Sequence, residues 1–215
     1  MLATPLDSPD SPKHPPKRQL SSVRSNGVGL KDRQQLTDQD YREGRPFDDE
    51  VIDHDFEDCD FTESDLSALL FEHCTFQNCN LSMTDIGGTR FQDVSFTDCK
   101  LMGVDFSVCS DFGFSAAFRD CNMNYASFWG LDMAHTEFAD CGLKEVNFTD
   151  ADLTKASFSG CDLRQAVFAG STLEGADFRG ARNFSIDPEN NEIEGAKFSR
   201  STLAGLLQKY DIVVE

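Results

Sequence analysis

The 215-residue chain lacks the motifs of the common catalytic sites. It contains no glycine-rich phosphate loop, no nucleophile elbow and no His-Glu-x-x-His pair. Its four histidines are dispersed, and one of them, His14, lies in a proline-rich leader. We therefore expect a protein that is not an enzyme and that uses no cofactor.

Long apolar runs are also absent. The sequence shows neither the apolar stretch of a secretory signal nor a segment long enough to cross a membrane. Cys-x-x-Cys pairs are missing, and no histidine stands at ligand spacing to two thiols, so we expect no metal or redox centre. Eight cysteines in a shorter secreted chain would suggest disulfides. Here we expect reduced thiols and a cytoplasmic location.

Positive charge is scarce: 19 Lys and Arg stand against 38 Asp and Glu, giving a net charge of −19. Residues 1–35 hold six of the basic and three of the acidic residues, together with five of the seven prolines, and we expect a disordered tail there. From residue 51 onward, 29 acidic residues face 11 basic ones. A chain this acidic is a poor candidate for binding nucleic acid directly.

An apolar residue recurs at every fifth position from Phe56 to Phe178, with one interruption. A period of five fits neither a strand, whose period is two, nor a helix, whose period is 3.6. A short repeat kept over this length predicts an all-β solenoid of stacked small units. The position two before each central residue is small or carries a thiol, and all eight cysteines occupy it. We therefore interpret these cysteines as inert packing residues.

Segments such as Ala151-Asp152-Leu153-Thr154-Lys155 and Ala176-Asp177-Phe178-Arg179-Gly180 resemble the pentapeptide-repeat family. This resemblance implies a right-handed, four-sided β-helix with twenty residues per coil. The sequence supports that coil length independently, because every twentieth residue falls on one phenylalanine column. Its members are Phe56, Phe76 and Phe96, then Phe118, Phe138, Phe158, Phe178 and Phe198.

Two stretches interrupt the repeat. The step from Phe96 to Phe118 is 22 residues, which places two extra residues between Val108 and Ala117. Asp111, Phe112 and Phe114 of this stretch form a candidate contact loop. The second interruption, residues 182–192, breaks the pattern but does not shift the phase of the five-residue repeat. Loops on a rigid scaffold often carry specificity, although both stretches are equally compatible with tolerated irregularities.

The two ends of the repeat need separate elements, because an open coil exposes unpaired edges and apolar surface. We interpret residues 36–50 as a lead-in and N-terminal cap, 51–200 as the β-helix, and 201–215 as a C-terminal element. Leu203, Leu206, Leu207 and Tyr210 share one face at α-helical spacing. Ile212, Val213 and Val214 then read as a short strand. In the drug-resistance branch of the family, such an element joins two coils, so we expect a homodimer through these residues.

The acidic residues follow the coil period. One column contains Asp58, Asp98, Asp120 and Asp140, with Asn78 between the first two. A second contains Asp65, Asp85 and Asp105. Rungs stack at about 4.8 Å, so each column lines up like charges, which costs stability. One explanation for the acidic columns is solubility, but keeping the rod soluble would need fewer charges. The alternative explanation is mimicry of DNA, which presents about one charge per 1.7 Å of its axis.

Further similarity narrows the family. Residues 71–81, 96–104, 128–131 and the C-terminal segment resemble the branch that confers resistance to albicidin and, in its Qnr-type members, to quinolones. This resemblance implies a DNA-like dimer that binds DNA gyrase, and in some members topoisomerase IV, and relieves inhibition by topoisomerase poisons. Two alternatives remain: a scaffold or adaptor with another partner, and a spacer whose basic tail recruits an unrelated protein.

Overall fold

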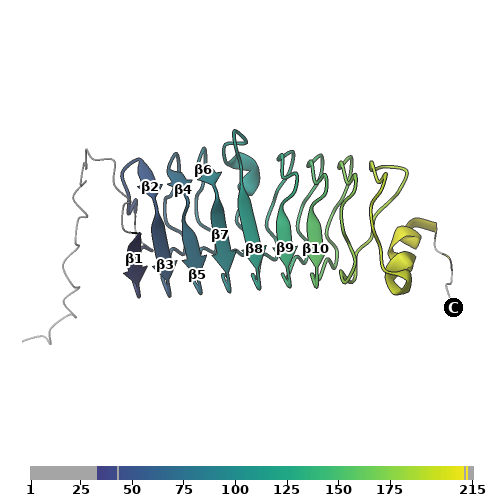
Figure 1. Cartoon of the computed structure of the whole chain (residues 1–215), viewed down its shortest axis with the longest axis horizontal. Coiled ribbons are helices and arrows are strands. Elements are labelled where there is room, and N and C mark those ends of the chain that lie inside the picture. The colour runs from purple at the N-terminus through teal and green to yellow at the C-terminus, as the bar shows by residue number, and fades with distance from the viewer. Residues whose placement is uncertain (1–32, 43, 211, 213–215) are drawn as a thin grey trace, which may run out of the picture.

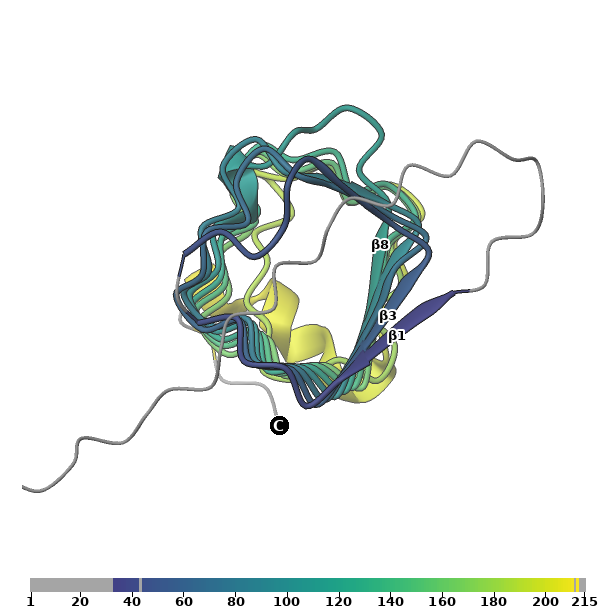
Figure 2. The same cartoon turned by 90° about the vertical axis from the view of Figure 1, so that its left-hand side faces the viewer.

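The structure, a computed structural model, describes residues 33–42, 44–210 and 212. Short parallel strands stack along one axis into a rod (Figure 1), whose outline along that axis has four sides (Figure 2). The all-β solenoid expected from the period of five is confirmed. Among the described residues, no helix is long and apolar enough to span a membrane.

Two sheets form two of the four sides, and we number the sides 1 to 4 in chain order. Side 1 is a seven-stranded sheet of β1 (Gln34–Thr37), β3 (His54–Glu57), β5 (Thr75–Gln77), β7 (Val94–Thr97), β8 (Ala116–Arg119), β9 (Glu137–Ala139) and β10 (Ser157–Ser159). Side 4 begins as a three-stranded sheet of β2 (Glu50–Ile52), β4 (Leu70–Glu72) and β6 (Arg90–Gln92). Isolated parallel bridges build sides 2 and 3, for example Asp60 with Asn80 and Asp65 with Asp85.

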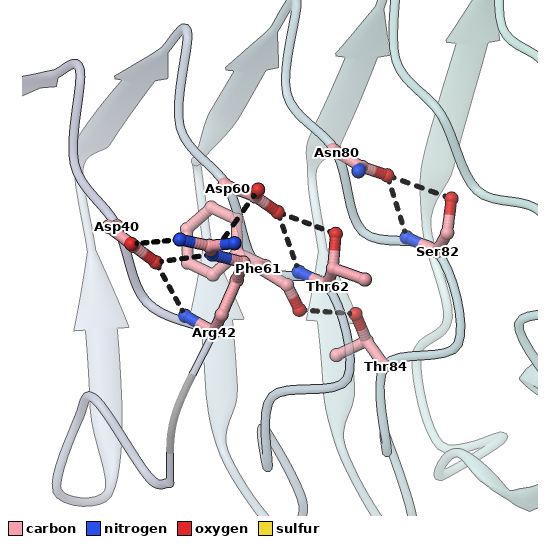
Figure 3. A network of polar contacts seen from close by, with 8 residues as sticks. All are labelled: Asp40, Arg42, Asp60, Phe61, Thr62, Asn80, Ser82 and Thr84. Carbon is pink, nitrogen blue, oxygen red and sulfur yellow. Dashed lines mark hydrogen bonds and ion pairs between the residues drawn. The ribbon is translucent and has the colours of Figure 1, made fainter.

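At most corners, the residue two positions after a central apolar residue adopts a positive φ, as Glu63 (57°) and Gly103 (66°) do. The 3-10 turn η1 (Phe106–Val108) replaces this conformation at one corner. The residue before the central one then stabilises the next turn with its side chain, as Figure 3 shows on side 2. Asp60 accepts hydrogen bonds from the backbone N–H and hydroxyl of Thr62, and Asn80 does the same for Ser82. These local hydrogen bonds explain why polar residues recur in the repeat.

The core consists of the large and small inward residues predicted from the repeat. Phe56, Phe76 and Phe96 lie in register on successive strands, and their rings stack at centroid distances of 4.7 and 4.9 Å. The column continues through Phe118 to Phe198. Such stacking of fully buried rings explains why the period is so strict, because a smaller residue would leave a void.

The cysteines are buried and free, and six of them form a column on side 2. Each thiol of this column donates to main-chain carbonyls, as Cys99 does to Phe76 (3.3 Å) and Thr97 (3.2 Å). Burial raises the pKa of Cys74 to about 11 and that of Cys109 to about 12. Such thiols are poor nucleophiles, which fits a packing role.

The N-terminal rung begins earlier than the sequence indicated. β1 pairs with β3 from Gln34, so it crosses the expected boundary at residue 35. Tyr41 stacks on Phe61 (4.8 Å), Phe47 packs edge-on against Phe56 (5.7 Å), and together they cover the end of the core. Burial raises the pKa of Tyr41 to about 12.

The C-terminal helix occurs where expected but differs in type. It winds as two 3-10 segments, η2 (Arg200–Leu206) and η3 (Gln208–Tyr210), rather than as an α-helix. A 3-10 helix has three residues per turn, so the predicted α-helical face does not form as one stripe. Ile212 has no strand conformation, and Val213 and Val214 lie outside the described residues.

Candidate functional site

The first acidic column lies at the corner between sides 1 and 2, and we call it the acidic corner. Its backbone is fixed by hydrogen bonds to the next coil, such as Asp98 N to Arg119 O (3.0 Å) and Asp120 N to Ala139 O (2.9 Å). All of its side chains are exposed. The acidic corner consists of Asp38, Asp58, Asn78, Asp98, Asp120 and Asp140.

Backbone conformation explains part of this composition. Every residue of the acidic corner has a φ between 50° and 55°, a region in which Asp and Asn are enriched. Equivalent corner positions elsewhere hold Ala68 (55°), Met83 (58°), Tyr125 (65°) and Lys155 (56°). The conformation therefore does not require an acid, and the repeated carboxylates exceed what the turn needs.

The acidic corner ends at Gly160. A Cβ atom there would clash with the carboxylate of Asp140, so glycine leaves room for that side chain. Gly180 continues the corner in the next coil with a φ of 87°. The row of carboxylates is therefore confined to the N-terminal part of the rod.

The second predicted column, Asp65, Asp85 and Asp105, lies on side 3. Its carboxylates cap local turns: Asp65 and Asp105 each accept from a serine N–H and hydroxyl, and Asp85 accepts from the N–H of Gly87. The hydroxyl and N–H of Ser67 lower the pKa of Asp65. Side 2 separates this column from the acidic corner, so the structure does not bring the two columns onto one surface.

A third acidic row was missed in the sequence. It lies on side 4 in the C-terminal part of the rod, where bridges connect Asp132, Asp152, Thr172 and Glu192 in successive coils. Glu174 and Glu194 flank it along the chain. The same twenty-residue spacing that revealed the other columns would have found it.

The loop at residues 111–114 contains the two extra residues. Ser110 N still binds Thr89 O (2.9 Å) in the ordinary register, whereas Val94 N binds Ser115 O (3.1 Å) after the shift. Figure 2 shows this loop standing out of the outline of the rod. Asp111 is exposed, and Phe112 is 78% exposed. Phe114 is half-buried beside Phe91 (6.2 Å) and Phe106 (6.4 Å), so it anchors the loop rather than presenting a contact.

The second interruption, residues 182–192, receives the C-terminal helix. Lys209 Nζ lies 2.6 Å from both Asp187 and Glu189, and the Tyr210 hydroxyl donates to Glu189 (2.9 Å). The hydrogen bonds from Lys209 lower the pKa of both carboxyl groups. Ile186 N also binds Gly205 O (3.0 Å). Residues 182–192 therefore bind the C-terminal helix, residues 200–210, which forms the cap at this end of the rod. These contacts within the chain explain the irregular sequence of the interruption.

The predicted dimerisation residues divide into two groups. Leu206 is half-buried and packs against the core, which makes it part of the cap. Leu203, Leu207, Tyr210 and Ile212 are exposed, and Ile212 is 55% accessible. The C-terminal end of the rod thus presents apolar surface. Val213 lies outside the described residues.

The described residues provide no group of three or more His, Cys, Asp and Glu side chains arranged to hold a metal ion. Trp129, an exposed aromatic residue on side 3 within the stretch 128–131, donates from Nε1 to Asp150 (3.2 Å).

Comparison with known proteins agrees with this architecture. The family model described as "pentapeptide repeat region" matches residues 51–111, 114–178 and 132–207. No curated protein sequence matches the chain at a significant level.

Solved structures with the same fold include trypsin-treated QnrB1, described as a plasmid-mediated fluoroquinolone resistance protein. It shares 20% identity over 85% of this chain and 98% of its own, with a TM-score of 0.57. HetL from Nostoc sp. strain PCC 7120, a pentapeptide repeat protein involved in the regulation of heterocyst differentiation, shares 19% identity over 75% and 81% of the two chains, with a TM-score of 0.50.

Proposed function

The chain belongs to the pentapeptide-repeat family, and from this premise we propose that it is a DNA-mimicking protein that binds bacterial DNA gyrase and protects it from a topoisomerase poison. Topoisomerase IV is a second candidate target. In this proposal the protein works in the cytoplasm, where thiols stay reduced, and it does not bind nucleic acid itself.

The observation that carries the proposal is the acidic corner. Five of its six members are exposed carboxylates, which lie along a slim rod in successive coils about 4.8 Å apart, with Asn78 in place of one of them. A basic groove that binds the DNA backbone recognises regularly spaced negative charge. Other residue types occupy the same corner conformation elsewhere in the rod, so turn chemistry alone does not account for the row.

Two other features support contact with a large partner. The loop at 111–114 stands out of the outline of the rod (Figure 2), and its residues Asp111 and Phe112 are exposed. Leu203, Leu207, Tyr210 and Ile212 would join two rods end to end as a homodimer, because they leave apolar surface at the C-terminal end. A dimer of this kind would double the length of the acidic surface.

The test is a gyrase supercoiling and cleavage-complex assay with the purified protein, with and without albicidin-like and quinolone poisons. Rescue in the presence of one poison would support protection and would identify the drug class. Inhibition without rescue would keep the DNA mimic but make it a regulator of gyrase. No effect in either assay would contradict the proposal.

The alternative is a non-catalytic scaffold or adaptor with another partner. The likeness to HetL favours it, since that protein shares the fold and is described as involved in the regulation of heterocyst differentiation. Salt dependence separates the two: an electrostatic mimic loses affinity steeply as ionic strength rises, whereas an adaptor that binds through apolar contacts does not. If the basic tail recruits an unrelated partner instead, deletion of residues 1–32, which leaves β1 intact, would abolish that interaction.

A further inference from the structure

We propose that side 1, from β5 to β10, is the face that the partner's basic surface covers, with the acidic corner as its edge. This inference rests on the proposed function and specifies its contact surface. The acidic corner borders both side 1 and side 2, so a partner drawn to it would lie against one of the two.

Side 1 is a parallel sheet, and most of its outward side chains from β5 to β10 are short. Over these five strands, only Arg119 and Glu137 carry charge. The outward residues are Thr75, Gln77, Ser95, Thr97, Ala117, Arg119, Glu137, Ala139, Ser157 and Ser159. A partner surface can approach such a face closely without displacing long side chains or burying many charges.

Side 2 is less suited to a basic partner because cations already lie beside its acids. Arg164 and Arg182 lie 3.8 and 4.0 Å from Asp162, and Lys100 adds a further positive charge on this side. A basic partner would have to compete with these cations for the carboxylates of side 2. The strands β5 to β10 of side 1 contain a single cation, Arg119, so a partner drawn to the acidic corner meets less competition there.

A shallow hollow of about 200 Å³ marks the centre of the proposed face. Ser95, Thr97, Ala117, Arg119, Glu137 and Ala139 line it above the buried rings of Phe96 and Phe118. The hollow exists because Ala117 and Ala139 are small: Ala117 lies beside Glu137, and Ala139 beside Arg119, on adjacent strands.

The hollow fits an extended basic side chain of the partner. The methylene groups of an arginine or lysine would cover Ala117 and Ala139, and its charged group would meet Glu137, with Asp140 at the end of the same rung. Arg119, on the same face, would repel this basic side chain of the partner. The same face thus contains residues whose replacement should weaken binding and one whose replacement should strengthen it.

The test measures the affinity of the full-length protein for purified gyrase. The double variant Ala117→Gln/Ala139→Gln fills the hollow without changing charge, and we expect at least a tenfold loss of affinity. The matched control Thr149→Gln/Ala169→Gln places the same side chain at two outward, half-buried positions on the opposite side 3. We expect less than a twofold change there.

A second pair tests the sign of the charge effect. Arg119→Gln should raise the affinity several-fold, whereas Arg164→Gln on side 2 removes the same net charge and should have little effect. Equal effects of the two glutamine doubles, or of the two arginine variants, would overturn the assignment of side 1 while leaving wild-type binding intact. Failure of the wild-type protein to bind gyrase would remove the proposed function and this face with it. Circular dichroism confirms that each variant is folded.

Discussion

The rings of Phe96 and Phe118 stack at a centroid distance of 5.3 Å with an interplanar angle of 6°, although 22 residues separate them. Every other step along this column, from Phe56 to Phe198, spans 20 residues. The two extra residues are accommodated in the projecting loop at 111–114, so the stack stays continuous. Core packing therefore takes precedence over surface regularity in this rod.

The phenylalanine column should be sensitive to truncation. Phe138 is fully buried between the stacked rings of Phe118 and Phe158. Phe138→Ala leaves a cavity that a solenoid of rigid rungs cannot close, so we expect a loss of about 3–5 kcal/mol in the free energy of unfolding. Urea denaturation measures it. The control Phe112→Ala, in the exposed loop, should stay within about 0.5 kcal/mol, and a similar loss in both would contradict the role of the column.

Charge reversal in the acidic corner should separate binding from folding. We expect Asp98→Lys/Asp120→Lys/Asp140→Lys to abolish gyrase binding and to leave the circular dichroism spectrum unchanged. The fold should tolerate lysine there because Lys155 already occupies the same backbone conformation, with a φ of 56°. Isothermal titration at two salt concentrations provides the affinity.

Neutralisation gives the matched control for that variant. Asn78 already stands in the acidic corner at a φ of 50°, so Asp98→Asn/Asp120→Asn/Asp140→Asn keeps the preferred corner residue and removes only the charge. We expect a smaller loss of affinity than with lysine and a weaker dependence on salt. Unchanged affinity in both triple variants would exclude the acidic corner from the interface.

Acid should release the C-terminal helix. The folded-state pKa values of Asp187 and Glu189 lie below their ordinary values of 3.8 and 4.5 because Lys209 donates to both. Groups with a lowered pKa stabilise the fold above their ordinary pKa and lose that contribution as the pH falls through the folded value. Hydrogen exchange in residues 200–210 should therefore rise as the pH drops below about 4.5. After correction for intrinsic exchange, Lys209→Gln should show the faster rate already at pH 7, and a wild-type rate there would refute the role of this cluster.

Gly205 should be irreplaceable at the end cap. A Cβ atom at this position would lie 2.5 Å from the ring of Phe184, which is itself buried. Gly205→Ala should therefore push η2 off the end of the rod and cost about 1–3 kcal/mol. Thermal unfolding measures the stability, and sedimentation velocity measures the proposed dimerisation. Gly142→Ala, where the nearest atom is a side-chain oxygen at 3.4 Å, is the control and should be nearly neutral.

The sequence predicted some parts of the candidate surface better than others. The twenty-residue spacing placed Asp58, Asp98, Asp120 and Asp140 in one row, and the structure has them at one corner. The same spacing could not show that Asp65, Asp85 and Asp105 lie one side further on, because that depends on where the four corners fall. Phe114 looked equivalent to Phe112 in the sequence, yet Phe112 is exposed and Phe114 is half-buried.

The C-terminal element shows a similar limit. Leu203, Leu206, Leu207 and Tyr210 fit an α-helical stripe by spacing, but the segment forms a 3-10 helix, in which Gly205 lies close to Phe184 and Lys209 lies 2.6 Å from Asp187. Such contacts join residues about twenty positions apart. Helix propensity and spacing depend on neighbouring residues only, so they do not predict these contacts.

The sequence by itself determined the solenoid, the length of its coil, the identity of its core and the place of the two extra residues. It could do so because each rung repeats the same local pattern of large, small and corner residues, and a repeated local pattern has one periodic solution. Only the tertiary structure decided which acids share a surface, which residues of the loop are exposed, and that residues 182–192 hold the end cap. Those properties depend on the direction of each corner and on contacts between coils, which no spacing along the chain records.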